Sequence, residues 1–149
     1  LFATVAEITS AQTPANAGED SVSFLPALKG KSGQVREATI HHSINGSFAI
    51  RKGDWKLALC PGSGGWSYPR PADTKKMDLP PIQLFNLKTD PSETKNVYQS
   101  NPDKTRELYA LLKSHVEKGR STPGPNQMNE GKTLFDPAGF DAIKAELKL

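Results

Sequence analysis

The sequence predicts an α+β fold, in which a small four-stranded antiparallel sheet carries one long helix packed on one of its faces. Three observations support this fold. Alternating apolar segments separated by turn signals fill residues 38–60, another short apolar segment spans 82–87, and a capped amphipathic segment spans 101–119. Shorter helices and a long Gly/Pro-rich loop at 61–81 are expected to flank the sheet.

The N-terminal segment is predicted to contain two short helices. Phe2, Val5 and Ile8 recur at helical spacing, which predicts a first helix over about 1–11. After a loop, Asp20 or Ser21 can cap a short helical turn. The apolar residues of this turn, which we expect to be buried, are Phe24, Leu25 and Leu28.

The sheet begins as a predicted meander of three strands over 38–44, 47–51 and 55–60, and a fourth strand is expected at 82–87. Asn45-Gly46 joins the first two strands, and in the favoured two-residue hairpin turn both of these residues have positive φ. Alternation then places one apolar set on one face of the sheet. This set comprises Ile40, His42, Ile44, Phe48, Ile50, Trp55, Leu57 and Leu59.

The long helix has the clearest boundaries. Asn101 can cap it, Pro102 suits its first position, and Gly119 follows its end. Its expected buried stripe comprises Leu108, Leu111, Leu112, His115 and Val116. A terminal helix is expected from about residue 137 to 147, with Phe140, Ile143 and Leu147 aligned.

Composition excludes several functional classes. The net charge of +3 comes from 19 basic and 16 acidic residues that are interspersed, whereas nucleic-acid binding needs clustered phosphate contacts. No apolar run is long enough to span a membrane. A single cysteine, Cys60, allows neither an internal disulfide nor a cysteine-rich zinc site. The chain begins Leu-Phe-Ala without a signal peptide, so we expect it to be part of a larger protein.

The residues do not form a complete catalytic set. His41 and His42 are adjacent on a predicted strand, so they point to opposite faces and cannot both bind one metal ion. Cys60 could act with either histidine, which leaves a small cysteine-dependent hydrolase as an alternative, although a lone cysteine at a strand end is more often inert. The run Gly62-Ser63-Gly64-Gly65 has neither the helix of a nucleophile elbow nor the lysine of a phosphate loop.

Two motifs resemble the C-terminal region of the arylsulfatase-type sulfatases. Residues 37–60 read EATIHHSINGSFAIRKGDWKLALC, and residues 84–97 read LFNLKTDPSETKNV, which is similar to the family pattern LFNL-x-x-DPxExxN. Residues 1–8, 20–26 and 119–124 also fit the family. Together, in this order, these segments extend the resemblance to about residue 125.

This resemblance implies a domain organisation. Residues 1–36 would connect to a catalytic domain outside this sequence, 37–119 would form the C-terminal sulfatase subdomain, and 120–149 would be a tail with a short helix. The larger protein would hydrolyse sulfate esters and would be periplasmic or secreted. Its partners would be its own catalytic domain and a sulfated small molecule or glycan, with no nucleic acid and no membrane.

The resemblance also implies that no catalytic or metal residue lies in this chain. Sulfatases of this type use calcium and a formylglycine made from the cysteine of a Cys-x-Pro/Ala-x-Arg motif. After Cys60, Gly62 stands where Pro or Ala is required and Gly64 stands where Arg is required. The Asp-Asp and Asp-Asn pairs that hold the calcium are absent from the sequence. We therefore expect no cofactor in this chain and no activity of the chain alone.

What the resemblance does imply is a lining role in the substrate cleft. The candidates for substrate contact are His41, His42, Trp66 and Arg70, because Arg and His favour an anionic sulfate and Trp stacks on a sugar or aryl ring. The structural alternatives are a half-buried His42 on the apolar face and a Trp66 that plugs the joint to the missing domain.

The leading alternative function is a free-standing module that binds carbohydrate or sulfated glycan through Trp66, Tyr68 and Arg70. If the catalytic domain is missing, apolar residues that normally face it should be exposed, and a dimer could form through them. The candidates for this exposed surface are Phe2, Val5, Ile8 and Trp66.

Overall fold

A computed structural model describes residues 1–130 and 136–149 of the chain. The chain divides into two compact units. Unit 1 comprises Leu1–Glu37 and Lys113–Lys132, and unit 2 comprises Ala38–Leu112 and Thr133–Leu149. The domain boundaries expected from the resemblance stay predictions.

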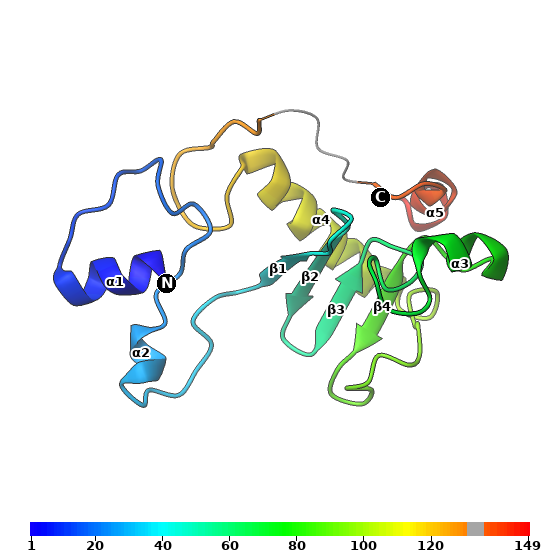
Figure 1. Ribbon diagram of the computed structural model, residues 1–149, viewed down its shortest axis with the longest axis horizontal. Helices are drawn as coiled ribbons and strands as arrows, with labels where there is room; N and C mark the ends of the chain where they lie inside the picture. The colour runs from blue at the N-terminus through cyan, green and yellow to red at the C-terminus, as the bar shows by residue number, and fades with distance from the viewer. Residues whose placement is uncertain (131–135) are drawn as a thin grey trace. The chain divides into compact units, whose positions relative to one another are not determined.

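Unit 2 contains a four-stranded antiparallel sheet of order β1-β2-β3-β4, which confirms the predicted fold class (Figure 1). The strands are β1 (Thr39–His42), β2 (Phe48–Lys52), β3 (Trp55–Ala58) and β4 (Gln83–Asn86). β1, β3 and β4 are shorter than the segments that predict them, because the ends of these segments form the turns, whereas β2 keeps the predicted length and is shifted by one residue.

The first turn differs from the prediction. Of Asn45 and Gly46, only Gly46 has a positive φ, of 82°. The Gly46 N–H donates to the Ser43 carbonyl (3.0 Å) and the Ser43 N–H donates to the Ser47 carbonyl (2.9 Å). These bonds define a three-residue loop with one left-handed glycine, not a two-residue turn. Ile44 consequently lies in the loop and is 66% exposed, although it was expected on the apolar face.

One face of the sheet forms the core of unit 2. Ile50, Leu57 and Leu84 lie side by side in adjacent strands, and each has no exposed surface. Helix α4 (Pro102–Lys118) belongs to unit 2 up to Leu112, and this part packs on the same face and contributes the fully buried Leu108 (Figure 1).

The predicted bounds of α4 are confirmed, but its buried face lies closer to its N-terminus than expected. Leu108 and Leu112 are fully buried as predicted, whereas the expected Leu111, His115 and Val116 are only half-buried. Thr105 and Tyr109, which were not expected, are buried as well. Trp55, which was expected in the core, is half-buried because it begins β3 next to a turn.

Helix α5 (Phe140–Leu147) packs on α4 within unit 2. The rings of Tyr109 and Phe140 meet edge to face, with their centroids 5.3 Å apart. Arg106 Nη1 donates to the Leu147 carbonyl (2.9 Å). Phe140, Ile143 and Leu147 are all buried, so the predicted terminal helix and its apolar stripe are confirmed.

The long loop between β3 and β4 contains a helix that we did not predict, α3 (Pro71–Met77). Pro71 occupies its first position, and the backbone N–H of Arg70 donates to Asp73 Oδ2 (3.0 Å). Proline followed by an acidic residue in the first turn is a helix-start signal, so the sequence contained the information.

Unit 1 contains α1 (Phe2–Thr9) and α2 (Leu25–Leu28), and the expected cap of α2 is wrong. The helix begins after Phe24, whose apolar side chain cannot cap it. Ser21 instead accepts a hydrogen bond from the Ala3 N–H (2.9 Å), and Thr4 Oγ1 accepts one from the Phe24 N–H (3.1 Å). The expected burial is also wrong for Phe24 (37% exposed) and Leu28 (64% exposed).

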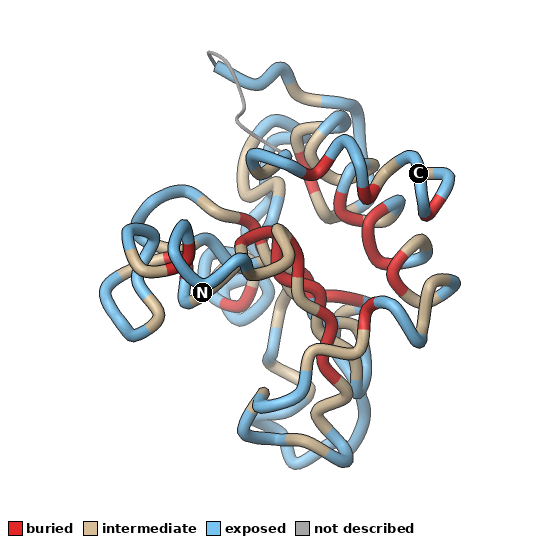
Figure 2. Tube along the Cα trace, turned by 90° about the vertical axis from the view of Figure 1, so that its right-hand side faces the viewer, coloured by how far each residue is buried: buried red, intermediate tan, exposed pale blue. Residues whose placement is uncertain are grey.

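A buried arginine organises the loops of unit 1. Arg120 is 7% exposed, and its guanidinium donates to the backbone carbonyls of Ala15 (3.1 Å), Pro125 (2.8 Å) and Pro123 (3.0 Å). Gly124 lies directly against this guanidinium, with a φ of 146° and no space for a Cβ. Along the chain near the N-terminus most positions are exposed (Figure 2). No helix in the described ranges is long and apolar enough to cross a membrane.

Candidate functional site

A hollow of about 490 Å³ lies on the sheet of unit 2, over the face opposite the apolar core. The strand register explains it. His41, Ala49, Ala58 and Gln83 lie side by side in successive strands. Because the two central residues carry only methyl groups, the middle of this face is low, and the longer side chains of His41 and Gln83 stand on either side. We call this feature the alanine hollow.

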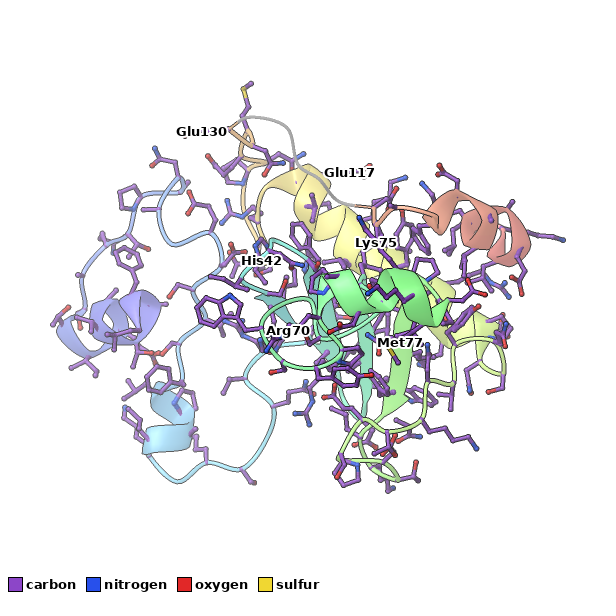
Figure 3. All side chains as sticks on the ribbon, turned by 45° about the vertical axis from the view of Figure 1, so that its right-hand side comes forward. His42, Arg70, Lys75, Met77, Glu117 and Glu130 are labelled. Atoms are coloured by element: carbon purple, nitrogen blue, oxygen red, sulfur yellow. The ribbon has the colours of Figure 1, made fainter. Side chains whose placement is uncertain are left out.

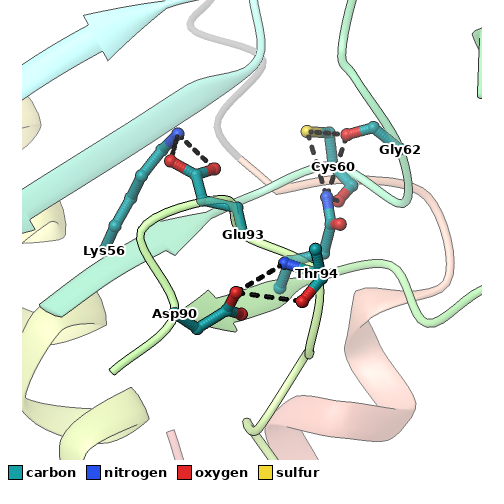
Figure 4. A network of polar contacts seen from close by, with 7 residues as sticks. Lys56, Cys60, Gly62, Asp90, Glu93 and Thr94 are labelled. Atoms are coloured by element: carbon teal, nitrogen blue, oxygen red, sulfur yellow. Dashed lines mark hydrogen bonds and ion pairs between the residues drawn. The ribbon is translucent and has the colours of Figure 1, made fainter. Parts of the chain in front are cut away.

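The next row of the same face carries the charge. Arg51 and Lys56 are register partners, and Phe85 follows on β4. Lys56 Nζ contacts both carboxylate oxygens of Glu93, at 2.8 and 2.7 Å (Figure 4). Arg51 is exposed, its Nε donates to the Gly53 carbonyl (3.2 Å), and it forms no ion pair with any residue that the structure describes. The hollow therefore holds one neutralised cation and one available cation.

The motif DPSETKN positions Glu93. Asp90 accepts hydrogen bonds from the backbone N–H groups of Thr94 (3.1 Å, Figure 4) and Lys95 (2.8 Å), and these bonds lower the pKa of Asp90. Asn96 accepts from the Leu84 N–H (2.9 Å) and so ties the segment to β4. Glu93 itself has a φ of 55°, which turns the chain toward Lys56. The strongest motif of the resemblance thus has a structural role.

The loop after β3 forms the rim of the hollow. Cys60 is buried, and its thiol donates to the Gly62 carbonyl (3.2 Å). The Gln83 amide bonds the same Gly62 carbonyl (2.9 Å) and fixes the loop. Burial raises the pKa of the Cys60 thiol, which keeps it protonated and unreactive. This geometry does not favour the cysteine-dependent hydrolase.

Of the four residues predicted to contact substrate, only the two histidines line the hollow. His41 and His42 both line the hollow, His41 from its own face and His42 at the end of β1, where its ring packs edge-on against Phe48 (centroids 4.0 Å apart). His42 is exposed, so the structural alternative of a half-buried His42 is wrong.

Trp66 and Arg70 lie on the rim loop and do not line the hollow. Trp66 is 81% exposed, and Arg70 Nε donates to its carbonyl (3.3 Å). Figure 3 shows His42 at the sheet and Arg70 in the loop that leads into α3. Tyr68, between these two loop residues, does line the hollow. The role of all four predicted residues in substrate contact stays a prediction.

Sequence reasoning missed Arg51, Lys56 and Glu93. The alternation of β2 and β3 carried a usable signal, because it places Arg51 and Ala49, and likewise Lys56 and Ala58, on the face opposite the apolar one. The pairing of Lys56 with Glu93 had no such signal, since it depends on how the segment after β4 folds back.

The described residues contain no group of three or more His, Cys, Asp or Glu side chains that could hold a metal ion. What the hollow offers is an exposed guanidinium, two imidazoles and the Tyr68 ring. Such groups can bind an anion attached to a ring, and they include no activated nucleophile.

Comparison with known proteins relates the chain to one enzyme class. No protein-family model matches it. The chain is 34% identical over 120 residues to an N-acetylgalactosamine-6-O-sulfatase of Bacteroides thetaiotaomicron. That alignment covers 76% of this chain, but the chain spans only 22% of the length of the relative.

Solved structures agree with this finding. One structure, from work on the metabolism of multiple glycosaminoglycans by Bacteroides thetaiotaomicron, matches with a TM-score of 0.61 and 32% identity, over 76% of this chain and 23% of that protein. Another, solved with its substrate D-glucosamine-2-N,6-O-disulfate, matches with a TM-score of 0.51 and 21% identity over 74% of this chain and 22% of that protein, so it shows the fold alone.

Proposed function

We propose that the chain is part of a sulfatase that hydrolyses sulfate esters. The resemblance to the sulfatases is confirmed, and the chain matches a domain-sized part of one of them. In this proposal the chain is the C-terminal part, and the alanine hollow helps to shape the substrate cleft. The observation that carries the proposal is the 34% identity over 120 residues to a named sulfatase.

The chemistry itself belongs to the rest of such an enzyme. In this proposal the formylglycine nucleophile and the calcium ligands lie outside the chain. The buried Cys60 thiol, whose pKa is raised, and the misfit of its surrounding motif support this division. The chain's own residues would bind and orient the substrate and would transfer no proton to the reacting atoms.

The substrate class follows from the relative and from the hollow together. The relative acts on 6-O-sulfated N-acetylgalactosamine by its name, and we propose a 6-O-sulfated amino sugar for this protein too. A guanidinium such as that of Arg51 can donate two parallel hydrogen bonds to a sulfate group. Tyr68 offers an aromatic face to a sugar ring.

The direct test is a sulfate-release assay. The protein encoded by the whole reading frame that contains this sequence is incubated with N-acetylgalactosamine 6-sulfate, and free sulfate is measured. We expect release by the whole protein and none by residues 1–149 alone. A whole protein that releases no sulfate from 6-O-sulfated amino sugars, or a chain that does so alone, would contradict the proposal.

The binding-module alternative also has an observation in its favour. Trp66 and Tyr68 are 81% and 74% exposed, and Arg70 lies beside them. If this loop is an autonomous glycan site, Trp66→Ala should abolish glycan binding by residues 1–149. In the sulfatase proposal the same substitution leaves binding in the alanine hollow intact.

Unit 1 fits a location against the rest of a larger protein. Phe2, Val5 and Ile8, which were expected to be exposed, are 49%, 49% and 59% exposed. We propose that the catalytic domain of the whole protein covers these residues and that the whole protein is periplasmic or secreted. Dimerisation through the same residues is the competing outcome, and sedimentation of the whole protein distinguishes the two.

A further inference from the structure

We propose that the alanine hollow binds one sulfated sugar residue of a glycan, other than the residue whose sulfate is hydrolysed, and that Arg51 is the residue that recognises its sulfate group. The choice of a sulfated sugar rests on the function proposed above. The arrangement of cavity and cation rests on the structure alone, and so does the assignment of Arg51, which the sequence did not single out.

The shape of the hollow suits a single ring. Its volume of about 490 Å³ is within the range of small-molecule sites, which is roughly 300–1,000 Å³. Ala49 and Ala58 form the floor, and the flanking Phe85 is 5% exposed. The floor is therefore firm, since it consists of the backbone of central strands and of side chains packed against it.

The charges of the hollow favour one anion at one position. Glu93 accepts from Lys56 through both carboxylate oxygens, and the two side chains are only 33% and 27% exposed. Arg51 is the neighbour of Lys56 on β2 and has no such partner among the described residues. An incoming sulfate is thus attracted to Arg51 and repelled by Glu93, which orients the sugar across the floor.

The site is already organised without a ligand. The Arg51 Nε bond to the Gly53 carbonyl holds the guanidinium near the turn. Glu93 is held by the Asp90 turn, and the Tyr68 hydroxyl contacts Met77 Sδ at 3.6 Å. Little conformational entropy is then lost on binding, which favours affinity.

The negative charge of Glu93 should weaken the binding of a sulfated sugar to the hollow. Glu93→Gln removes the negative charge and releases Lys56, so the affinity for a sulfated sugar should rise. If Glu93 acted only by holding the fold together, the same substitution would lower affinity. This readout separates an electrostatic role in the hollow from a purely structural one.

The experiment titrates residues 1–149 with N-acetylgalactosamine 6-sulfate and with unsulfated N-acetylgalactosamine, and follows binding by NMR chemical shifts. We expect a preference for the sulfated sugar. Arg51→Gln should raise its Kd about tenfold or more, as expected for a lost charge-assisted hydrogen bond. Ala49→Leu, which fills the hollow, should abolish binding. Lys75→Gln on α3, an exposed charge outside the hollow, is the matched control and should change nothing.

Three results would overturn the proposal: no binding by the wild-type chain, equal binding of the two sugars, or an unchanged Kd in Arg51→Gln with a thermal unfolding curve like that of the wild type. Failure of the proposed function is seen separately. If the whole protein releases no sulfate but Arg51-dependent binding persists, the hollow is a binding site without an enzyme. If sulfate is released but the hollow binds nothing, only this inference fails.

Discussion

Unit 2 is held together by apolar side chains, whereas unit 1 is held together by hydrogen bonds. Among the described residues of unit 2, six apolar side chains have no exposed surface, and these are Ile50, Leu57, Ile82, Leu84, Leu108 and Leu112. In the described part of unit 1 the only buried residues are Thr4 and Arg120, and both are polar. The apolar residues of α1 lie on the surface instead.

This difference shows that one chain can contain a self-sufficient core and a segment without one. Burial of apolar surface contributes roughly 25 cal/mol per Å², so unit 2 has a large stabilising contribution that unit 1 lacks. Hydrogen bonds add a modest net amount each, since they replace bonds to water. Unit 1 should therefore open locally before unit 2 unfolds.

The largest effect is expected in the core of unit 2. Leu57→Ala removes a fully buried side chain from the centre of the sheet and should lower the free energy of unfolding by about 2–5 kcal/mol. Urea denaturation measures this loss. Ile44→Ala, at a position that is 66% exposed, is the matched control and should change stability by less than about 0.5 kcal/mol. Equal effects at both positions would contradict the account.

A smaller, local effect is expected in unit 1. Arg120→Met leaves the buried carbonyls of Ala15, Pro123 and Pro125 without their donor, at a cost of about 1–3 kcal/mol. Hydrogen exchange should then accelerate in the loops of unit 1 and stay unchanged in the sheet. Lys31→Met, which removes an exposed charge, serves as the control. Faster exchange throughout the sheet would show that the two units are one cooperative body.

The Lys56–Glu93 ion pair should contribute less again. Both side chains retain about a third of their exposure, so the Coulomb attraction is screened by solvent. A double-mutant cycle with Lys56→Met and Glu93→Gln should give a coupling of about 0.5–1 kcal/mol that shrinks in high salt. A coupling that salt leaves unchanged would contradict a screened pair.

The smallest expected effect is a difference between the two units in how their stability depends on pH. Burial lowers the pKa of His115 below its ordinary value of 6.5, and its Nδ1 has no hydrogen-bond partner among the described residues. Below pH 6.5 the unfolded state binds more protons than the folded state, so the stability of unit 1 falls as the pH falls.

In unit 2 the corresponding loss begins only below pH 4.5, the ordinary value from which the hydrogen bond to Lys104 lowers the pKa of Glu107, and Asp90, whose pKa backbone hydrogen bonds lower from 3.8, follows at lower pH. Hydrogen exchange at pH 7.5 and 5.5, corrected for its intrinsic pH dependence, should therefore show weakening in unit 1 alone. His115→Gln should remove that difference. Equal protection of unit 1 at both pH values would contradict the assignment.

The sequence predicts unit 2 better than unit 1 for a physical reason. Periodicity identifies which residues are apolar, and in unit 2 the strands and α4 bring those residues against one another. In α1 the same periodicity holds, but Phe2, Val5 and Ile8 remain 49%, 49% and 59% exposed. Burial of polar Arg120 was unpredictable, because its carbonyl partners come from separate loops.

The candidate site shows the same limit. His41 could be predicted from its neighbours in sequence, whereas the hollow depends on the register that sets Ala49 beside Ala58. From the sequence, Arg51 and Lys56 are expected to be solvent-facing charges on a strand. Only the fold shows that Lys56 pairs with Glu93 and that Arg51 lies beside this pair in the hollow. The alternation within one strand therefore predicts which face of the sheet a residue lies on, but only the register between strands shows a cavity.

The DNA sequence immediately upstream of the Leu1 codon decides whether this chain is part of a sulfatase or a protein of its own. We expect an open reading frame of several hundred residues that contains Cys-x-Pro/Ala-x-Arg and the acidic pairs that hold calcium. A start codon directly before Leu1 would contradict it, because the chain would then be an autonomous small protein whose likeness to sulfatases reflects ancestry and not activity.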